Sequence, residues 1–281
     1  MFDQAQKLRD YYNSPVSKKA NNNRQLISIT SGKGGTGKTF AAFYLSQFLA
    51  KQGYKTLLVE FDFNLGSLSY HLNINPDATI CDLFSGSALF DETIVEVENN
   101  YSIIFGDNGK LNFPENKVAH IRNFFGYLNN KTNNYDYIIL DNGAGISNEI
   151  FETIKHSTMN LIVTTPDPVA VMDAYVILKL MTKNSIDIHK GIIINKCKNP
   201  EEGKTAFENL SKASKHFLKE DINFVGSISN SDLTNSLQLI SSSNFNDTPN
   251  RKLFSEFEFI SQAISKIGQV ANNHQPNFIR P

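Results

Sequence analysis

The stretch QLISITSGKGGTGKTF, residues 25–40, decides the fold of this 281-residue chain. Its first half is a short run of apolar and β-branched residues, which predicts a buried strand. The second half matches the pattern GxxxxGK[ST] of a phosphate-binding loop over 32–39, and the apolar residues after it predict a helix over 39–53. In such a loop, backbone N–H groups curl around the phosphates, Lys38 reaches the β- and γ-phosphates, and the Thr39 hydroxyl coordinates Mg²⁺. The sequence therefore predicts a nucleotide-phosphate site.

Similar strand-like runs recur along the chain and alternate with helical patterns. The strand-like runs lie at 25–31, 55–62, 101–106, 135–141, 160–165, 191–196 and 223–229, and the helical patterns at 39–53, 115–131, 167–183 and 203–220. Continuous apolar strands alternating with helices predict a mostly parallel, twisted sheet with helices on both faces. We therefore expect a single α/β P-loop NTPase domain over 25–268. It would be preceded by a helix and flexible linker over 1–24 and followed by a polar tail over 269–281.

Composition excludes several classes of protein. A net charge of −1, with 40% apolar and 20% charged residues, argues against a protein that coats nucleic acid, so no direct DNA binding is expected. Cys81 and Cys197 are isolated, which leaves neither a disulfide framework nor a metal knuckle. The sequence contains no signal-peptide core and no apolar run of about 18 residues, so we expect a cytoplasmic protein.

Two further strands end in acidic residues. The second predicted strand runs into VEFDFNLGSL, which contains Glu60 and Asp62, and the strand YDYIILD ends in Asp141. An apolar strand that ends in an aspartate, in a chain with a phosphate loop, is how a carboxylate reaches the Mg²⁺ of the bound nucleotide. Gly143 and Gly145 follow Asp141 and give this switch loop the freedom to respond to a γ-phosphate.

The interior of the phosphate loop resembles that of the deviant Walker A ATPases, the MinD and ParA family. Lys33 is a second lysine, five positions before Lys38, in the segment KGGTGKT. In that family the early lysine crosses to the nucleotide of a second subunit. The resemblance thus implies an ATPase that binds ATP and Mg²⁺ and forms an ATP-dependent homodimer. It also implies that Asp62 orients the attacking water, and it places Glu60, one methylene longer than the family's Asp, near the Mg²⁺ shell.

The motif and the resemblance together give a set of site residues. The segment GIIINKCKN resembles the family's base-binding segment and places Asn195 near the adenine, although a strand-end cap is an equal alternative. The expected catalytic residues are Lys33, Lys38 and Asp62; the nucleotide-binding residues are Gly32, Lys33, Gly34, Gly35, Thr36, Gly37, Lys38, Thr39, Phe40 and Asn195; the metal-site residues are Thr39, Asp62, Asp141 and Glu60; and the switch-loop residues are Gly143 and Gly145.

Two segments narrow the resemblance to the flagellar-number regulators FlhG, also called FleN. DNGAGIS at 141–147 and TTPDPVAVMDAY at 164–175 are similar to segments of those proteins, with Asn142 where Thr is common. The resemblance implies a switch that regulates flagellar number or placement. Its partners would include a flagellar transcription regulator or a basal-body protein.

The first residues resemble the DQAxxLR motif of FlhG, which in that family docks on the SRP-type GTPase FlhF and stimulates GTP hydrolysis. Apolar residues at 2, 5, 8 and 12 recur at helical spacing, and the polar linker over 13–24 follows. We therefore expect residues 1–12 to bind FlhF. The expected contact residues are Asp3, Gln4, Ala5, Leu8 and Arg9.

Two other functions are open at this point. One is MinD- or ParA-like positioning of the division site or another cargo, and the other is a nucleotide-binding scaffold without turnover, which Glu60 alone supports. The apolar stripe over 253–267 lines up with the family's last core helix, and the tail after it lacks a basic amphipathic face. Direct membrane binding is therefore not expected, and recruitment to a cell pole or to the inner face of the membrane would depend on a partner.

Overall fold

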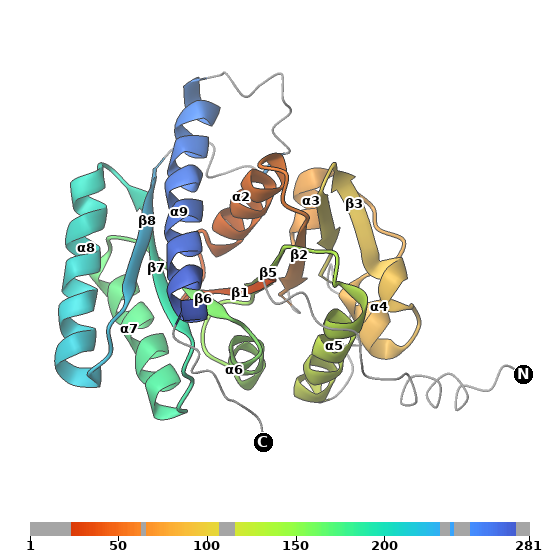
Figure 1. Ribbon diagram of the computed structural model, residues 1–281, viewed down its shortest axis with the longest axis horizontal. Coiled ribbons are helices and arrows are strands. Elements are labelled where there is room, and N and C mark those ends of the chain that lie inside the picture. Colours follow the sequence, from red (N-terminus) through yellow and green to blue (C-terminus); the bar gives the residue numbers. More distant parts are fainter. Residues whose placement is uncertain (1–23, 63–65, 107–115, 231–236, 239–247, 274–281) are drawn as a thin grey trace, which may run out of the picture.

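The computed structural model describes residues 24–62, 66–106, 116–230, 237–238 and 248–273. Within these residues the chain forms one eight-stranded sheet in the order β3-β4-β2-β5-β1-β6-β7-β8 (Figure 1). Every neighbouring pair of strands is parallel except β3 and β4. The predicted α/β fold with a mostly parallel sheet is confirmed.

Seven of the strands match the predicted runs. The bounds are β1 Gln25–Thr30, β2 Thr56–Phe61, β3 Ile94–Glu98, β4 Tyr101–Ile104, β5 Tyr137–Asn142, β6 Met159–Thr164, β7 His189–Cys197 and β8 Asn223–Ser229. The strand that the sequence analysis lacks is β3, at the sheet edge, where it pairs with β4 through a tight turn. Asn100 allows that turn because it adopts a positive φ of 61°.

The four long helical patterns are confirmed as α2, α5, α7 and α8. The helices are α2 Lys38–Lys51, α3 Leu68–Leu72, α4 Ile80–Ser85, α5 Lys117–Lys131, α6 Asn148–Lys155, α7 Pro168–Lys183, α8 Pro200–Ala213 and α9 Thr248–Asn273, with a 3₁₀ turn η1 at Phe90–Thr93 and a π turn η2 at Ser214–Leu218. The short helices α3, α4 and α6 were not predicted, since so few residues show little helical periodicity. Helix α9 ends at Asn273, beyond the predicted domain boundary at residue 268.

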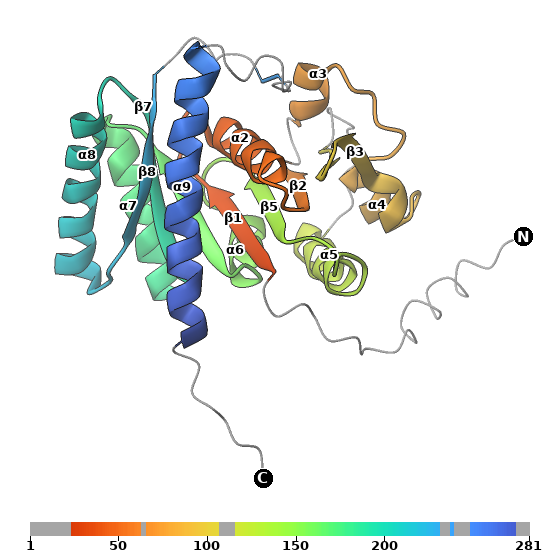
Figure 2. The same ribbon diagram turned by 45° about the horizontal axis from the view of Figure 1, so that its top comes forward.

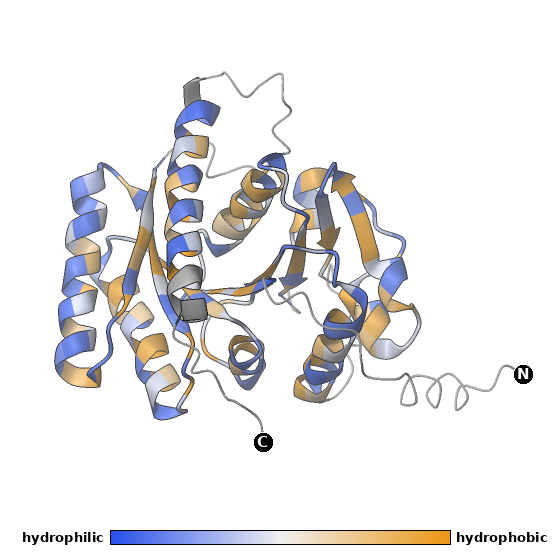
Figure 3. Ribbon diagram, in the orientation of Figure 1, coloured by the Kyte–Doolittle hydropathy of each residue, from blue (hydrophilic) through white to orange (hydrophobic). Residues whose placement is uncertain are grey.

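Helices cover both faces of the sheet (Figures 1 and 2). The core on one face joins the sheet to α2 and α9, and the core on the other joins it to α4, α5, α6, α7 and α8. Helix α2 is buried on nearly all sides, because it packs on the sheet and α9, which also packs on the sheet, lies beside it. Figure 3 shows the hydrophobic residues gathered on the strands and the hydrophilic ones on the outer helix α8. This burial fixes the N-terminus of α2, which follows the phosphate loop.

The chain enters the described domain at Arg24. Its guanidinium donates to Leu128 O at 3.0 Å, Thr132 Oγ1 at 3.0 Å and Asn129 Oδ1 at 2.9 Å, at the C-terminal end of α5. Since β1 begins at Gln25, this anchor lies at the amino end of β1, whereas the phosphate loop follows its carboxyl end.

Residues 1–23, which include the predicted FlhF-binding helix, lie outside the described residues, as do 274–281. In the described part of the chain, no helix is long and apolar enough to cross a membrane.

Candidate nucleotide-binding site

The phosphate loop joins the carboxyl end of β1 to the N-terminus of α2, as the sequence predicted. Gly37 is the N-cap of α2, with a φ of 86°, and a Cβ on it would lie 2.0 Å from Asn195 Nδ2. A Cβ on Gly32 would lie 2.4 Å from Asp173 Cβ, because α7 packs against the loop there. These two positions therefore need glycine for space, and Gly37 needs it for its backbone conformation as well.

Lys38 and Asp141 form a buried ion pair at the centre of the site. Lys38 Nζ lies 2.8 Å from Asp141 Oδ1, and the two side chains are 7% and 1% exposed. Asp141 occupies this place because β5 pairs with β1, which puts Ile29 beside it in the sheet. Lys38 Nζ also lies 3.5 Å from the Thr39 hydroxyl. The P-loop lysine, the P-loop threonine and the strand-end aspartate thus meet, although Asp141 is about a hundred residues from the loop in sequence.

Buried polar atoms without a partner mark the space for a ligand. Among the described residues, Asp141 Oδ2 and Thr36 Oγ1 are buried and accept or donate no hydrogen bond within the chain. A buried polar atom without a hydrogen-bond partner lowers the stability of the fold, unless a ligand, an ion or water binds to it. A carboxylate oxygen and a threonine hydroxyl are also the donors that Mg²⁺ prefers. The residues present thus fit Mg²⁺: Asp141, through its unpartnered Oδ2, and Thr39, whose hydroxyl lies near the same Lys38 ammonium, are those that would hold it, whereas the Thr36 hydroxyl is left for another polar group of the ligand.

Glu60 lies beside Asp141 in the sheet and is almost fully buried. Its Oε1 accepts hydrogen bonds from the backbone N–H of Ser67 at 2.6 Å and Leu68 at 3.1 Å, and its Oε2 accepts one from Gly106 at 2.9 Å. Both oxygens are therefore engaged with backbone. Glu60 holds the chain after β2 to the chain after β4, next to the predicted metal site.

Burial raises the pKa of Glu60 from its ordinary value of 4.5 to about 7, opposed by the Gly106 N–H and helped by the charge of Asp141. Between these two pH values the folded chain binds more protons than the unfolded chain. The contribution of protonated Glu60 to the free energy of unfolding is therefore fully present below pH 4.5. It is lost as the pH rises through 7, and the free energy of unfolding falls by on the order of 3 kcal/mol.

Glu60→Gln should remove that part of the pH dependence, since glutamine does not titrate. Urea unfolding gives the free energy of unfolding at pH 5 and at pH 8. The decrease between the two pH values should be larger for wild type than for Glu60→Gln. The exposed Glu258→Gln serves as the control and should retain the wild-type slope. Equal slopes for wild type and Glu60→Gln would show that Glu60 is not the titrating group.

Asp62 and the switch-loop glycines lie at the ends of β2 and β5. A Cβ on Gly143 would lie 3.9 Å from Asp62 Oδ1, and both residues line a cavity of about 260 Å³ that Lys117 also borders. Gly145, with a φ of 91°, donates its N–H to Ser31 O at 2.9 Å, which ties the switch loop to the start of the phosphate loop. The structure thus brings the predicted water-orienting acid and the predicted switch loop together.

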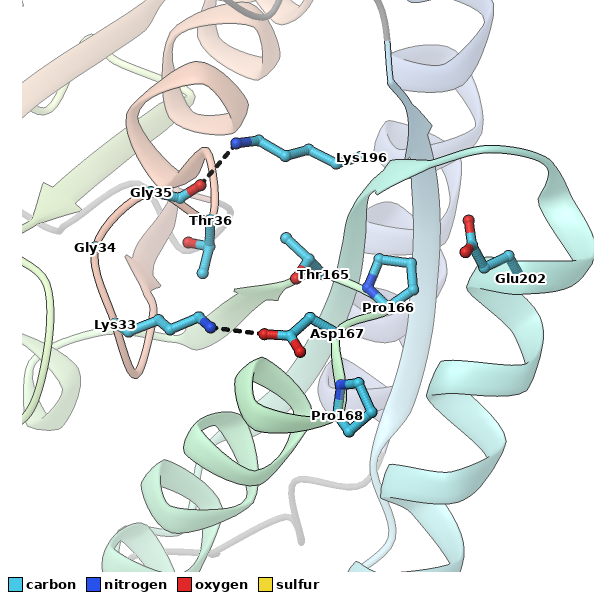
Figure 4. Close-up of a pocket in the computed structure, with 10 residues that line it drawn as sticks. All are labelled: Lys33, Gly34, Gly35, Thr36, Thr165, Pro166, Asp167, Pro168, Lys196 and Glu202. Carbon is cyan, nitrogen blue, oxygen red and sulfur yellow. Dashed lines mark hydrogen bonds and ion pairs between the residues drawn. The ribbon is translucent and has the colours of Figure 1, made fainter.

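Lys33 reaches across to helix α7 of its own chain. Its Nζ lies 2.7 Å from Asp167 Oδ2, and the two side chains are 39% and 47% exposed (Figure 4). Asp167 is the N-cap of α7, and hydrogen bonding to Lys33 lowers the pKa of its carboxyl. Together with the loop these residues border a pocket of about 630 Å³, lined by Lys33, Gly34, Gly35, Thr36, Thr165, Pro166, Asp167, Pro168, Lys196 and Glu202. The predicted crossing of Lys33 to a second subunit stays a prediction.

Asn195 touches the phosphate loop itself. Its buried side chain donates from Nδ2 to Thr36 O at 2.8 Å and accepts from Lys196 N at 2.8 Å. The predicted contact with adenine is untested by these bonds, which show instead how the end of β7 supports the loop.

Phe40 lies in the core, where its ring packs 4.7 Å from that of Tyr44 and 6.5 Å from that of Phe257. The Phe40 side chain is therefore not available to a nucleotide, and the predicted nucleotide contact would have to come from its backbone.

Three residues near the site have roles that the sequence analysis did not foresee. Asn142 points into the core, where it donates to Ser28 Oγ at 2.8 Å and Ile29 O at 3.0 Å and accepts from Thr153 at 2.5 Å. Asp167 could have been found as an N-cap, since it precedes a proline at a helix start. Its pairing with Lys33, and the bond from Lys196 Nζ to Gly35 O, had no local signal.

Comparison with known proteins identifies the family. The AAA_31 family, described as an AAA domain, matches residues 24–194, which is more than half of the chain. The flagellum site-determining protein YlxH of Helicobacter pylori is 33% identical over 212 residues, covering 75% of this chain and 71% of YlxH. The antiactivator FleN of Pseudomonas aeruginosa is 24% identical over 204 residues, covering 73% of each chain.

A solved structure agrees in fold. The septum site-determining protein MinD of Pyrococcus horikoshii, complexed with Mg-ADP, has a TM-score of 0.66 and 22% identity, covering 88% of this chain and 98% of MinD. The chain belongs to the AAA_31 family and is a MinD-like P-loop ATPase related to YlxH and FleN.

Proposed function

We propose that the chain is an ATP-dependent monomer/dimer switch. The observation that carries this is the position of Lys33. It belongs to the phosphate loop, yet its ammonium lies on the surface against Asp167 instead of inside its own loop, where Lys38 lies. An exposed ion pair of this kind is weak and is easily exchanged. Lys33 is therefore available to the γ-phosphate of a nucleotide on a second copy of the chain.

Hydrolysis follows from the groups around the loop. The loop N–H groups and Lys38 bind the β- and γ-phosphates of ATP, and Asp62 orients the attacking water. Mg²⁺, when bound by Thr39 and Asp141, supplies the positive charge that neutralises the phosphate oxygens. Because the N–H of Gly145 donates a hydrogen bond to Ser31 O, a conformational change in the phosphate loop would move the switch loop as well. The P. horikoshii relative in complex with Mg-ADP supports ATP and Mg²⁺ as the ligands.

We assign the switch to flagellar number or placement. The 33% identity to a flagellum site-determining protein and the similarity to FleN support this role over cell division. A scaffold without turnover is disfavoured, since Lys38 and Asp141 form a buried ion pair and Asp62 lies beside Gly143, two residues after Asp141. The chain would work in the cytoplasm and reach a pole or the inner face of the membrane through a partner, such as a flagellar transcription regulator or a basal-body protein.

Residues 1–12 supply a second activity in this proposal, the activation of the GTPase FlhF. A helix of about a dozen residues is marginal alone and orders on a partner. Arg24 anchors the chain at the amino end of β1, opposite the carboxyl end that the phosphate loop follows. The domain thus begins away from the ATP site, and we propose that residues 1–12 act separately from that site.

The switch predicts that ATP with Mg²⁺, but not ADP, converts monomer to dimer, and that Lys33→Ala remains monomeric. Light scattering after gel filtration measures the mass. The matched control is Lys131→Ala, because Lys131 also forms an exposed ion pair of 2.8 Å, with Asp91 on the surface. Lys131→Ala should dimerise normally. A dimer of Lys33→Ala with ATP, equal to that of wild type, would refute the role given to Lys33.

A further inference from the structure

Two consecutive residues at the end of β7 bind two consecutive carbonyls of the phosphate loop. Asn195 Nδ2 donates to Thr36 O at 2.8 Å, and Lys196 Nζ donates to Gly35 O at 2.8 Å. Figure 4 shows the Lys196 side chain extended across the pocket toward Gly35. Asn195 is fully buried beneath the loop, whereas Lys196 is exposed.

This arrangement departs from regular strand geometry. Successive side chains of a strand point to opposite faces, so neighbours do not normally reach the same target. Here the pairing with β8 steps from Ile194 opposite Ser227 to Cys197 opposite Ser229, which leaves an extra residue in β7. Lys196 also has a φ of 59°, a left-handed conformation that costs a lysine free energy. The bulge and the positive φ turn its side chain to the loop that Asn195 already contacts.

The two bonds orient the loop's N–H groups. In a trans peptide the C=O and the following N–H point in opposite directions. With Gly35 O bound to Lys196, the N–H of Thr36 points away from Lys196. With Thr36 O bound to Asn195, the N–H of Gly37 likewise points away from Asn195. Both N–H groups are then free of β7, and successive free N–H groups of this kind form the concave site that binds phosphate.

We infer that Lys196 is a positioning residue, which together with Asn195 holds the phosphate loop in its binding conformation before the nucleotide arrives. Its role is to set the affinity for the diphosphate part of a nucleotide, which ADP and ATP share. The inference rests on nucleotide binding by the loop and is independent of the dimer switch.

The test is Lys196→Met, which keeps most of the side-chain length and removes the donor. Calorimetry with ADP and Mg²⁺ should show about tenfold weaker binding than wild type, while kcat at saturating ATP stays within about twofold. Amide exchange of the peptide spanning 32–39, measured without nucleotide, should become faster. Lys196→Arg should restore both measurements, since it replaces the donor. Lys198→Met is the matched control, because Lys198 is an exposed lysine two residues away and does not line the pocket.

Three results would overturn the inference. One is ADP affinity in Lys196→Met equal to wild type. Another is weaker binding with unchanged loop exchange, since that would mean a direct contact between Lys196 and the nucleotide. The third is a lower kcat with unchanged affinity. If wild type itself bound no ADP, nucleotide binding by the loop would fail and the inference with it; if wild type bound ADP and Lys196→Met bound it equally well, the inference alone would fail.

Discussion

Asp62→Ala is expected to lose ATP hydrolysis by about 10²- to 10⁴-fold, the usual cost of removing a group that directs proton transfer or water in the transition state. ATP binding should persist, because the loop, Lys38 and Asp141 are untouched. The variant should therefore accumulate as the ATP-bound dimer. Phosphate release measures the loss of hydrolysis, and light scattering measures the mass with ATP and Mg²⁺.

The matched control is Asp91→Ala, which removes an exposed aspartate that pairs with Lys131 on the surface. This control should hydrolyse ATP at the wild-type rate and return to monomer as ATP is consumed. An Asp62→Ala protein that hydrolyses ATP like wild type would remove Asp62 from the mechanism. One that binds ATP but stays monomeric would count against the switch.

Deletion of residues 1–20 is expected to abolish stimulation of the FlhF GTPase and to leave ATP hydrolysis unchanged. The physical reason is the separation of the two functions. The ATP site lies at the carboxyl ends of the strands, and Arg24 anchors the chain at the amino end of β1. GTP hydrolysis by purified FlhF, with and without each form of the protein, measures the effect.

A synthetic peptide of residues 1–20 should stimulate FlhF without the ATPase domain. Gln4→Ala should be the most damaging change in it, because Gln4 is the residue that we propose contacts the partner's nucleotide site. A peptide of the same composition in scrambled order is the control. Full stimulation by the deleted protein would show that the activating surface lies in the ATPase domain instead.

The sequence predicted the fold well for a physical reason. A parallel sheet is buried on both faces, so its strands are nearly continuous apolar runs, and the helices between them are long enough to show their period. Elements without those properties were missed. β3 is a half-exposed edge strand that pairs antiparallel to β4, and α3 and α6 are too short to show a period.

Some site residues turned out to serve other contacts, since local sequence does not show what a side chain touches. Phe40 follows the phosphate loop directly, yet its ring lies in the core because α9 packs on α2. Glu60 stands at a strand end like Asp141, but the backbone of Ser67 and Gly106 occupies its carboxylate. Asn142 faces the core because Ser28 and Thr153 bind its amide.

The sequence by itself determined the α/β fold, the phosphate loop and the acids that end β2 and β5, because each is encoded in a short contiguous pattern. Tertiary structure alone decided the pairing of Lys38 with Asp141, of Lys33 with Asp167 and of Lys196 with Gly35. These partners are 103, 134 and 161 residues apart in the chain. They meet because the parallel strands and the helices that follow them bring their ends to one edge of the sheet, and no local pattern records which ends become neighbours.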